Sequence, residues 1–162
     1  MLRPLLIIGV GGSGGKTIRA MKQSLERKFL ASHYAGGIPR AWQFLQIDTT
    51  RDGESFPAPM LDFDEFHQVV PAGCDFYEMR YSITQRGDIS DQQKMLAGWG
   101  IPYSAISIKD GAGQTRAIGR QVGVADSAKT LQAIQGSIAK MSAPSALAEL
   151  AEVARALGAK AP

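Results

Sequence analysis

The sequence predicts an α/β fold in which a parallel β-sheet is flanked by helices. Residues 5–8 (Leu-Leu-Ile-Ile) form a continuous apolar run, which is typical of a central parallel strand buried on both faces. An amphipathic helical pattern follows from Gly14 to about Ser32, and residues 41–48 then form a second apolar and aromatic strand pattern. Strand, helix and strand in this order indicate a Rossmann-like βαβ unit with a right-handed crossover.

Length and composition fit one globular domain. The chain has 162 residues, 44% of them hydrophobic, and we treat residues 1–162 as a single domain whose residues 143–162 form an alanine-rich terminal helix and tail. The net charge of +3 is mild and the basic residues are scattered, so nucleic acid is not an expected partner. No apolar run approaches the roughly 20 residues that cross a bilayer. With the single cysteine Cys74, this favours a cytoplasmic protein without membrane contact.

The first predicted helix should pack one face on the sheet. Its apolar residues recur at intervals of three and four, at Ile18, Met21, Leu25 and Phe29. The other faces carry polar residues, namely Arg19, Lys22, Gln23, Glu26 and Arg27. Residues 33–39 contain two glycines and a proline, which end the helix before the second strand.

Residues 51–100 are punctuated by prolines and glycines, and they predict only short elements. These are a strand within residues 63–70, a helical turn over residues 75–82 and a short helix over residues 90–97. Asp62, Asp64 and Glu65 lack the glycine of a calcium loop, so we expect a solvated acidic face there and no metal site. His33 and His67 lie near no nucleophile or ligand set, which favours ordinary surface or packing roles.

The last third of the sequence is predominantly helical. Glycines again precede a helix near residues 111–119, with Asp110 and Thr115 as candidate caps. Helical spacing then continues from Ile118 to Met141. After a break at residues 142–144, another helix is predicted over residues 145–157, and Gly158 is placed to end it.

The glycine-rich segment after the first strand is the strongest functional signal. Residues 9–14 (Gly-Val-Gly-Gly-Ser-Gly) open a helix, whose N-terminal N–H groups and dipole favour an anion. Glycine lets a phosphate approach the backbone closely. We therefore predict a phosphate-binding loop, because five glycines within residues 9–15 exceed what a tight turn requires.

Three other motifs overlap this loop. A dinucleotide site has an acidic residue about 20 residues further on, whereas Asp48 comes later, which disfavours NAD without excluding it. A P-loop, G-x-x-x-x-G-K-T, would need glycine where Val10 stands. The pattern G-x-S-x-G is formally present around Ser13, but no credible histidine partner follows, so Ser13 is not an expected nucleophile.

Two glycine loops together resemble the tubulin/FtsZ superfamily, and most closely its bacterial tubulin-like proteins. The first loop is residues 9–15, and the second comprises residues 111–114 (Gly-Ala-Gly-Gln) with Gly119-Arg120. Between them, residues 47–49 (Ile-Asp-Thr) resemble the motif that ends the second strand of that family. The resemblance spans residues 4 to about 141 and is specific in these three places.

The resemblance implies a GTP-binding domain that binds GTP or GDP with a magnesium ion (Mg²⁺). The first loop would wrap the phosphates with Gly11, Gly12, Ser13 and Gly14. The later loop would sense the terminal phosphate with Gly111, Ala112, Gly113 and Gln114. Asp48 and Thr49 would lie near the phosphate and magnesium, with no direct metal ligand or catalytic residue assigned. Lys16, Arg116 and Arg120 could add positive charge, although each is equally explained as a solvated helix charge.

Some family elements are missing from this sequence. The family has a further strand and a G-G-G-T-G-T-G-like loop after the helix that here ends near Met141. A guanine-recognition helix and the acidic loop that activates hydrolysis in a neighbouring subunit are also missing. We therefore expect the amino-terminal part of a GTPase domain, incomplete here, with weak or absent GTP binding and no hydrolysis.

In its full-length form such a protein would be a GTPase that assembles head-to-tail into filaments. Two alternatives stay open from the sequence. One is a fragment of an NAD(P)-binding oxidoreductase domain. The other is a non-hydrolysing structural or interaction module.

Overall fold

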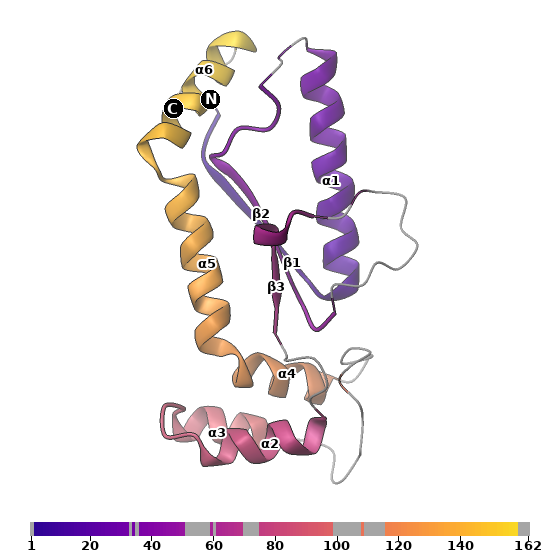
Figure 1. The fold of residues 1–162 in the computed structure, drawn as a ribbon, viewed down its shortest axis with the longest axis vertical. Helices are drawn as coiled ribbons and strands as arrows, with labels where there is room; N and C mark the ends of the chain where they lie inside the picture. Colours follow the sequence, from indigo (N-terminus) through magenta and orange to yellow (C-terminus); the bar gives the residue numbers. More distant parts are fainter. Residues whose placement is uncertain are drawn as a thin grey trace. The chain divides into compact units, whose positions relative to one another are not determined.

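The chain forms an α/β fold (Figure 1). The computed structural model describes residues 2–32, 34, 36–50, 59, 61–69, 75–98, 108 and 116–158. In order, its elements are β1 (Leu5–Val10), α1 (Gly11–Ala31), β2 (Trp42–Asp48), the 3₁₀ turn η1 (Phe63–Glu65), β3 (Phe66–Gln68), α2 (Phe76–Gln85), α3 (Asp91–Gly98), α4 (Arg116–Ala125), α5 (Ser127–Met141) and α6 (Pro144–Ala156). The predicted fold class, a Rossmann-like sheet with flanking helices, is confirmed.

Two compact units make up the chain. Unit 1 comprises Met1–Ile47, Gly53–His67 and Gln132–Pro162. Unit 2 comprises Asp48–Asp52 and Gln68–Leu131. The first unit contains β1, α1 and nearly all of β2, and the second contains α2, α3 and α4.

The sheet has the order β1-β2-β3, with β1 and β2 parallel in a register that runs from Leu5↔Trp42 to Val10↔Ile47. In β2 the consecutive residues Phe44 and Leu45 are both buried, so this strand is covered on both faces. In β1, by contrast, Ile8 is 39% and Val10 70% exposed. The expectation of a first strand buried on both faces was therefore wrong. Within the described ranges β2 is the central strand and β1 is an edge strand. A run of apolar residues in the sequence does not distinguish an edge strand from a central one.

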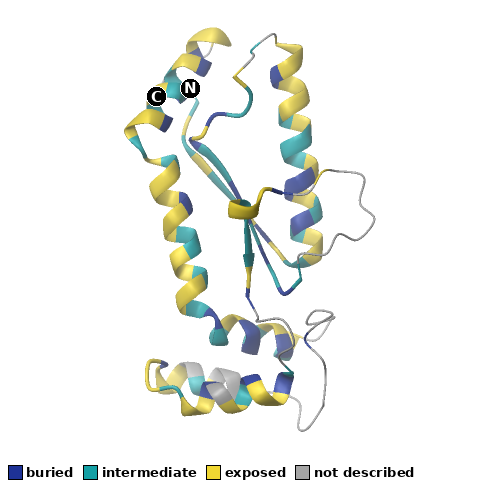
Figure 2. Ribbon diagram, viewed as in Figure 1, coloured by how far each residue is buried: buried dark blue, intermediate teal, exposed yellow. Residues whose placement is uncertain are grey.

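Helix α1 packs on the sheet through an apolar cluster of Ile18, Phe44 and Leu61. Figure 2 shows buried residues on α1 and along the strands. Arg19, expected on a polar face, is instead buried, and its Nε donates a hydrogen bond of 3.0 Å to the carbonyl oxygen of Pro59. A later segment of unit 1 therefore covers part of the helix surface that the sequence pattern assigns to solvent.

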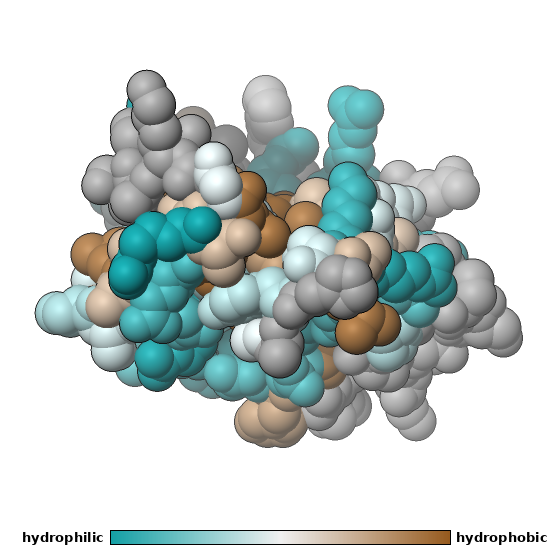
Figure 3. Space-filling view, turned by 90° about the horizontal axis from the view of Figure 1, so that it is seen from above, coloured by the Kyte–Doolittle hydropathy of each residue, from teal (hydrophilic) through white to brown (hydrophobic). Residues whose placement is uncertain are grey.

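Helix α6 packs against the beginning of β2. Ala146 and Leu150 form an apolar cluster with Ala41. The helix begins with Pro144, and Gly158 follows its end with a φ of 65°, as predicted for a glycine that terminates a helix. Figure 3 looks onto the molecule from above Figure 1, where apolar side chains lie between hydrophilic ones.

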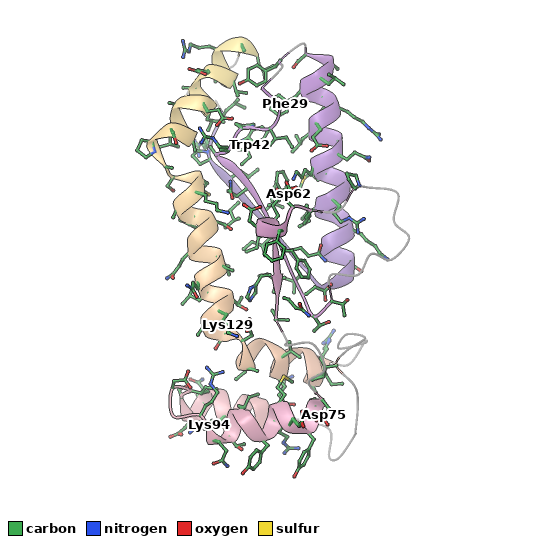
Figure 4. All side chains as sticks on the ribbon, in the orientation of Figure 1. Phe29, Trp42, Asp62, Asp75, Lys94 and Lys129 are labelled. Atoms are coloured by element: carbon green, nitrogen blue, oxygen red, sulfur yellow. The ribbon has the colours of Figure 1, made fainter. Side chains whose placement is uncertain are left out.

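The acidic residues of η1 are joined by lysines to two helices of unit 1. Lys22 of α1 lies 3.0 Å from Asp62 and 2.6 Å from Glu65, and Lys140 of α5 lies 2.7 Å from Asp64. Figure 4 shows Asp62 at η1 on the side of α1. Glu65 also accepts a hydrogen bond from the backbone N–H of Asp62, which completes a capping box. The predicted solvated acidic face is thus in part a set of ion pairs, and the described residues contain no cluster of three or more His, Cys, Asp or Glu side chains placed to hold a metal ion.

These contacts shift the pKa values of two groups. Burial opposes the charge of Lys22, but hydrogen bonds and attraction to Glu65 and Asp62 outweigh it and raise its pKa. The hydrogen bond from Lys140 lowers the pKa of Asp64. The Asp64 pair therefore contributes stability above the ordinary aspartate pKa, and this contribution is lost as the pH falls through the lowered value.

Replacing Lys22 with methionine should destabilise the chain by about 1 to 2 kcal/mol. Methionine keeps most of the apolar stem, but Glu65, whose side chain is 16% exposed, loses its charged partner. Denaturant unfolding of the variant measures the loss. Arg27→Met, on an exposed position of the same helix, is the matched control. Equal stability of both variants would show that the Lys22 ion pairs contribute nothing measurable.

Unit 2 is built from three packed helices. Helix α2 extends to Gln85, beyond the helical turn predicted over residues 75–82. Asp75 caps its start, where the carboxylate accepts a hydrogen bond of 2.7 Å from the N–H of Glu78. Its apolar face, including Met79 and Ile83, is buried, as are Ile118 and Val122 of α4, and both α2 and α3 pack on α4.

Helical structure does not run unbroken from residue 118 to residue 141. Asp126 lies between α4 and α5, and its carboxylate accepts a hydrogen bond of 3.2 Å from Oγ1 of Thr130. A side-chain acceptor at this position favours the start of a new helix. The predicted helical stretch is therefore two helices. None of the helices in the described ranges has the length and apolar content needed to cross a membrane.

Candidate functional site

The predicted phosphate-binding residues form the first turn of α1. The helix begins at Gly11, three residues before the predicted start, and Val10 precedes it in an extended conformation with φ −107° and ψ 129°. Gly11, Gly12 and Ser13 therefore carry backbone N–H groups that have no acceptor within the helix, whereas Gly14 is the first residue whose N–H can donate to the N-cap carbonyl oxygen of Val10. This turn contains no acidic residue, and no side chain caps it among the described residues. An anion is the ligand that such a turn favours.

The fold itself requires two of the loop glycines because backbone lies against backbone. A Cβ on Gly9 would lie 2.5 Å from the carbonyl oxygen of Gly14, and a Cβ on Gly14 would lie 2.8 Å from the carbonyl carbon of Gly9. This contact presses the start of α1 onto the end of β1. In dinucleotide-binding loops, a glycine of the motif likewise allows the helix to pack closely on the strand.

The next glycines along the loop have other roles. Gly11 has a φ of 70°, a left-handed conformation that glycine adopts at little cost. Gly12 has an ordinary φ, and a Cβ built on it would meet no atom within 4 Å. Neither packing nor backbone conformation in the described chain requires glycine at position 12. Without a side chain at Gly12, the space beside the N–H groups of the turn stays open, and a ligand can approach the backbone closely there.

Polar side chains accompany this turn. Ser13 is exposed, and its carbonyl oxygen accepts a hydrogen bond of 2.9 Å from Oγ1 of Thr17. Lys16 is half-buried and follows directly after the glycines. The first turn of α1 therefore combines backbone donors, a hydroxyl group and an adjacent positive charge within one stretch of unit 1.

Asp48 and Thr49 form a tight turn at the end of β2. The N–H of Thr49 donates a hydrogen bond of 2.7 Å to Oδ1 of Asp48, and Thr49 is 8% exposed. Two groups at the end of β3 fix the backbone here. Gln68 Nε2 donates a hydrogen bond to the carbonyl oxygen of Thr49, and the N–H of Val69 donates one to the carbonyl oxygen of Asp48, both at 3.0 Å. Asp48 directly follows Ile47, the register partner of Val10. The turn holds a carboxylate at the end of a parallel strand, where α/β folds bind ligands.

The remaining predicted residues belong to unit 2. Arg116 is exposed and Arg120 half-buried, one turn apart on α4. Gly111, Ala112, Gly113 and Gln114 lie outside the described residues, as do Asp110, Thr115, His33 and Cys74. The pairing of two glycine loops around one polyphosphate therefore stays a prediction.

Sequence reasoning overlooked Gln46. This residue of β2 is the register partner of Gly9, and its carboxamide occupies the place where a Cβ on Gly15 would be. One signal was available, because Gln46 is polar within the otherwise apolar run Phe44-Leu45-Gln46-Ile47. The packing role of Gly9 was overlooked as well, since the motif by itself does not tell which glycine serves the fold.

Comparison with known proteins shows which family the chain belongs to. A family model described as tubulin-like matches residues 6–158, which include β1, the glycine turn, the Asp48 turn and the helices up to α6. No curated protein and no solved structure matches the chain. Since the match covers nearly the whole chain, from the second residue of β1 to the glycine that ends α6, the chain belongs to the tubulin-like family.

Proposed function

We propose that the first turn of α1 binds the phosphates of a guanine nucleotide. The observation that carries this proposal is the place of Gly12, which has open space around it and lies in the first turn of α1, where backbone N–H groups have no acceptor within the helix. Unlike an open glycine in the interior of a helix, a glycine here lets an anion approach these N–H groups closely. Membership of the tubulin-like family supports GTP or GDP as that ligand.

Each part of the site has a role in this proposal. The N–H groups of Gly11, Gly12 and Ser13 would donate to phosphate oxygens, Gly14 would complete the turn that the phosphates contact, and Lys16 would add positive charge. Asp48 fits a magnesium ion, because a carboxylate held by its own turn is the kind of oxygen ligand that Mg²⁺ binds.

The proposal extends to self-association. In the full-length protein, nucleotide at a subunit boundary would favour head-to-tail contacts, a heterologous geometry that builds filaments. Hydrolysis is not proposed for residues 1–162, and the nucleotide-binding step alone is tested below.

Titration of the chain with GTP, GDP, ATP and NAD in the presence of magnesium tests the binding step. Backbone amide NMR signals are the readout, because they report weak binding and identify the residues involved. We expect GTP to shift the amide signals of Gly11, Gly12 and Gly14, and GDP to do so more weakly, because it brings one phosphate fewer. Tight NAD binding with no response to GTP would contradict the proposal and favour an oxidoreductase. No response to any nucleotide would favour an interaction module.

A further inference from the structure

Gly15 and Gln46 form a complementary pair beside the glycine turn. A Cβ on Gly15 would lie closer than 3.0 Å to the carboxamide of Gln46, which supplies all three of the atoms nearest to it. Gly15 is buried in α1, and Gln46 is half-buried in β2, both within unit 1. The carboxamide thus lies directly against the helix backbone where a side chain would normally be.

The position of Gln46 in the sheet explains this contact. Phe44 faces α1 through its cluster with Ile18, and side chains two residues apart in a strand share one face. Gln46 therefore faces α1 as well, one step nearer to the carboxyl end of β2. Its register partner is Gly9, which itself lies against Gly14. The amide is thus level with the turn whose N–H groups are proposed to bind phosphate.

Packing alone does not call for this pair. An apolar side chain on β2 opposite an alanine on α1 would fill a helix–sheet contact without burying an amide. Glycine within a helix also costs stability relative to alanine. Both residues therefore depart from the choice that stability favours, and they do so at the same contact.

We infer that Gly15 is a glycine because it admits the Gln46 carboxamide, and that Gln46 is a positioning residue for the phosphate-binding turn. It holds the start of α1 at the distance from β2 that points the N–H groups of the turn toward the ligand. This inference rests on the proposed function and adds to it a residue outside the glycine motif.

A double-mutant cycle tests the pair, with GTP and the base-free probe tripolyphosphate as ligands. Gly15→Ala displaces the carboxamide, and Gln46→Ala removes it. Each should weaken binding of both probes about 3- to 10-fold, because the turn would lose the contact that sets its distance from β2; a tenfold loss corresponds to about 1.4 kcal/mol. The double variant should bind no more weakly than the weaker single variant, because both substitutions remove the same contact. The thermal midpoint of Gly15→Ala should equal or exceed that of the wild type, since alanine favours the helix.

A charge variant separates positioning at the phosphate from a purely structural role. Gln46→Glu keeps the shape of the side chain but places a negative charge beside the anion. It should weaken GTP binding more than GDP binding, and the difference should shrink as salt is raised. Gln43→Glu makes the same charge change on the opposite face of β2 and should leave both affinities unchanged. Gln46→Met removes the amide but keeps the volume of the side chain. It is the variant to use if Gln46→Ala does not fold, and it should bind GTP as weakly as Gln46→Ala.

The outcomes distinguish this inference from the proposed function. Wild-type affinity in Gly15→Ala and all three Gln46 variants would overturn the inference and leave phosphate binding by the wild type intact. Additive losses in the double variant would also overturn it, because the two residues would then act separately. Absence of binding by the wild type would overturn the proposed function, and the inference with it.

Discussion

Alanine in place of Gly9 is expected to destabilise the chain by about 3 kcal/mol, the upper end of the usual cost of overpacking. The added methyl group would meet the carbonyl group of Gly14 at 2.5 Å, and it would lie 3.1 Å from Cγ2 of Ile18. A flexible side chain could rotate away, but the obstructing atoms are backbone atoms inside α1. The helix would have to move off β1 to make room. Denaturant unfolding measures the loss.

The control for this substitution is Gly136→Ala in α5. Gly136 lies within a helix, and a Cβ on it would meet no atom within 4 Å. Alanine there should raise stability by up to about 1 kcal/mol, the difference in helix propensity. If both variants had wild-type stability, the close contact between Gly9 and Gly14 would not exist in solution.

Alanine in place of Gly12 should weaken ligand binding without a loss of stability, whereas alanine in place of Gly9 should lower stability. It should weaken GTP binding about tenfold or more, equivalent to at least about 1.4 kcal/mol, because a methyl group would occupy the space kept beside the donor groups. Unfolding stability should be unchanged or slightly higher, because the site is open and alanine favours a helix. Calorimetric or NMR titration with GTP, paired with a thermal melt, measures both quantities.

Gly123→Ala in α4 is the matched control for Gly12→Ala. It adds the same methyl group to another helical glycine with open surroundings, in unit 2. Its GTP affinity should equal that of the wild type. Unchanged GTP affinity in Gly12→Ala would contradict the proposed phosphate site directly, because the added methyl group would lie where the phosphate is proposed to approach the turn.

The sequence was most informative where apolar periodicity and glycine spacing act locally. Runs of apolar residues predicted β1 and β2, helical periodicity predicted most of α1, and the glycines predicted a tight turn between β1 and α1. The start of α1 at Gly11 was not predictable, because it depends on the backbone contact between Gly9 and Gly14. The burial of Arg19 was hidden for a similar reason, since its partner Pro59 is distant in the sequence. A hydrogen-bonded pair of this kind leaves no periodic signal.

The candidate site shows the same division. Gly11, Gly12, Ser13 and Gly14 were predicted from a motif and lie together in one helical turn. Gln46 was not, because its role depends on the register between β1 and β2, which places it beside Gly9. The break at Asp126 depends on a side-chain hydrogen bond to Thr130, and helical spacing on both sides masks it.

The ion pairs of unit 1 also bear on the order in which the chain folds during synthesis. Arg40 contacts Glu149 at 2.7 Å, and Lys140 contacts Asp64 at the same distance, so residues from the last quarter of the chain complete a unit begun by the first. Unit 2 consists mostly of the continuous stretch Gln68–Leu131, so the contacts of α2 and α3 with α4 need no residue from the last quarter of the chain. During synthesis on the ribosome, α2, α3 and α4 can therefore pack together before α6, which completes the unit containing β1 and α1, has been made.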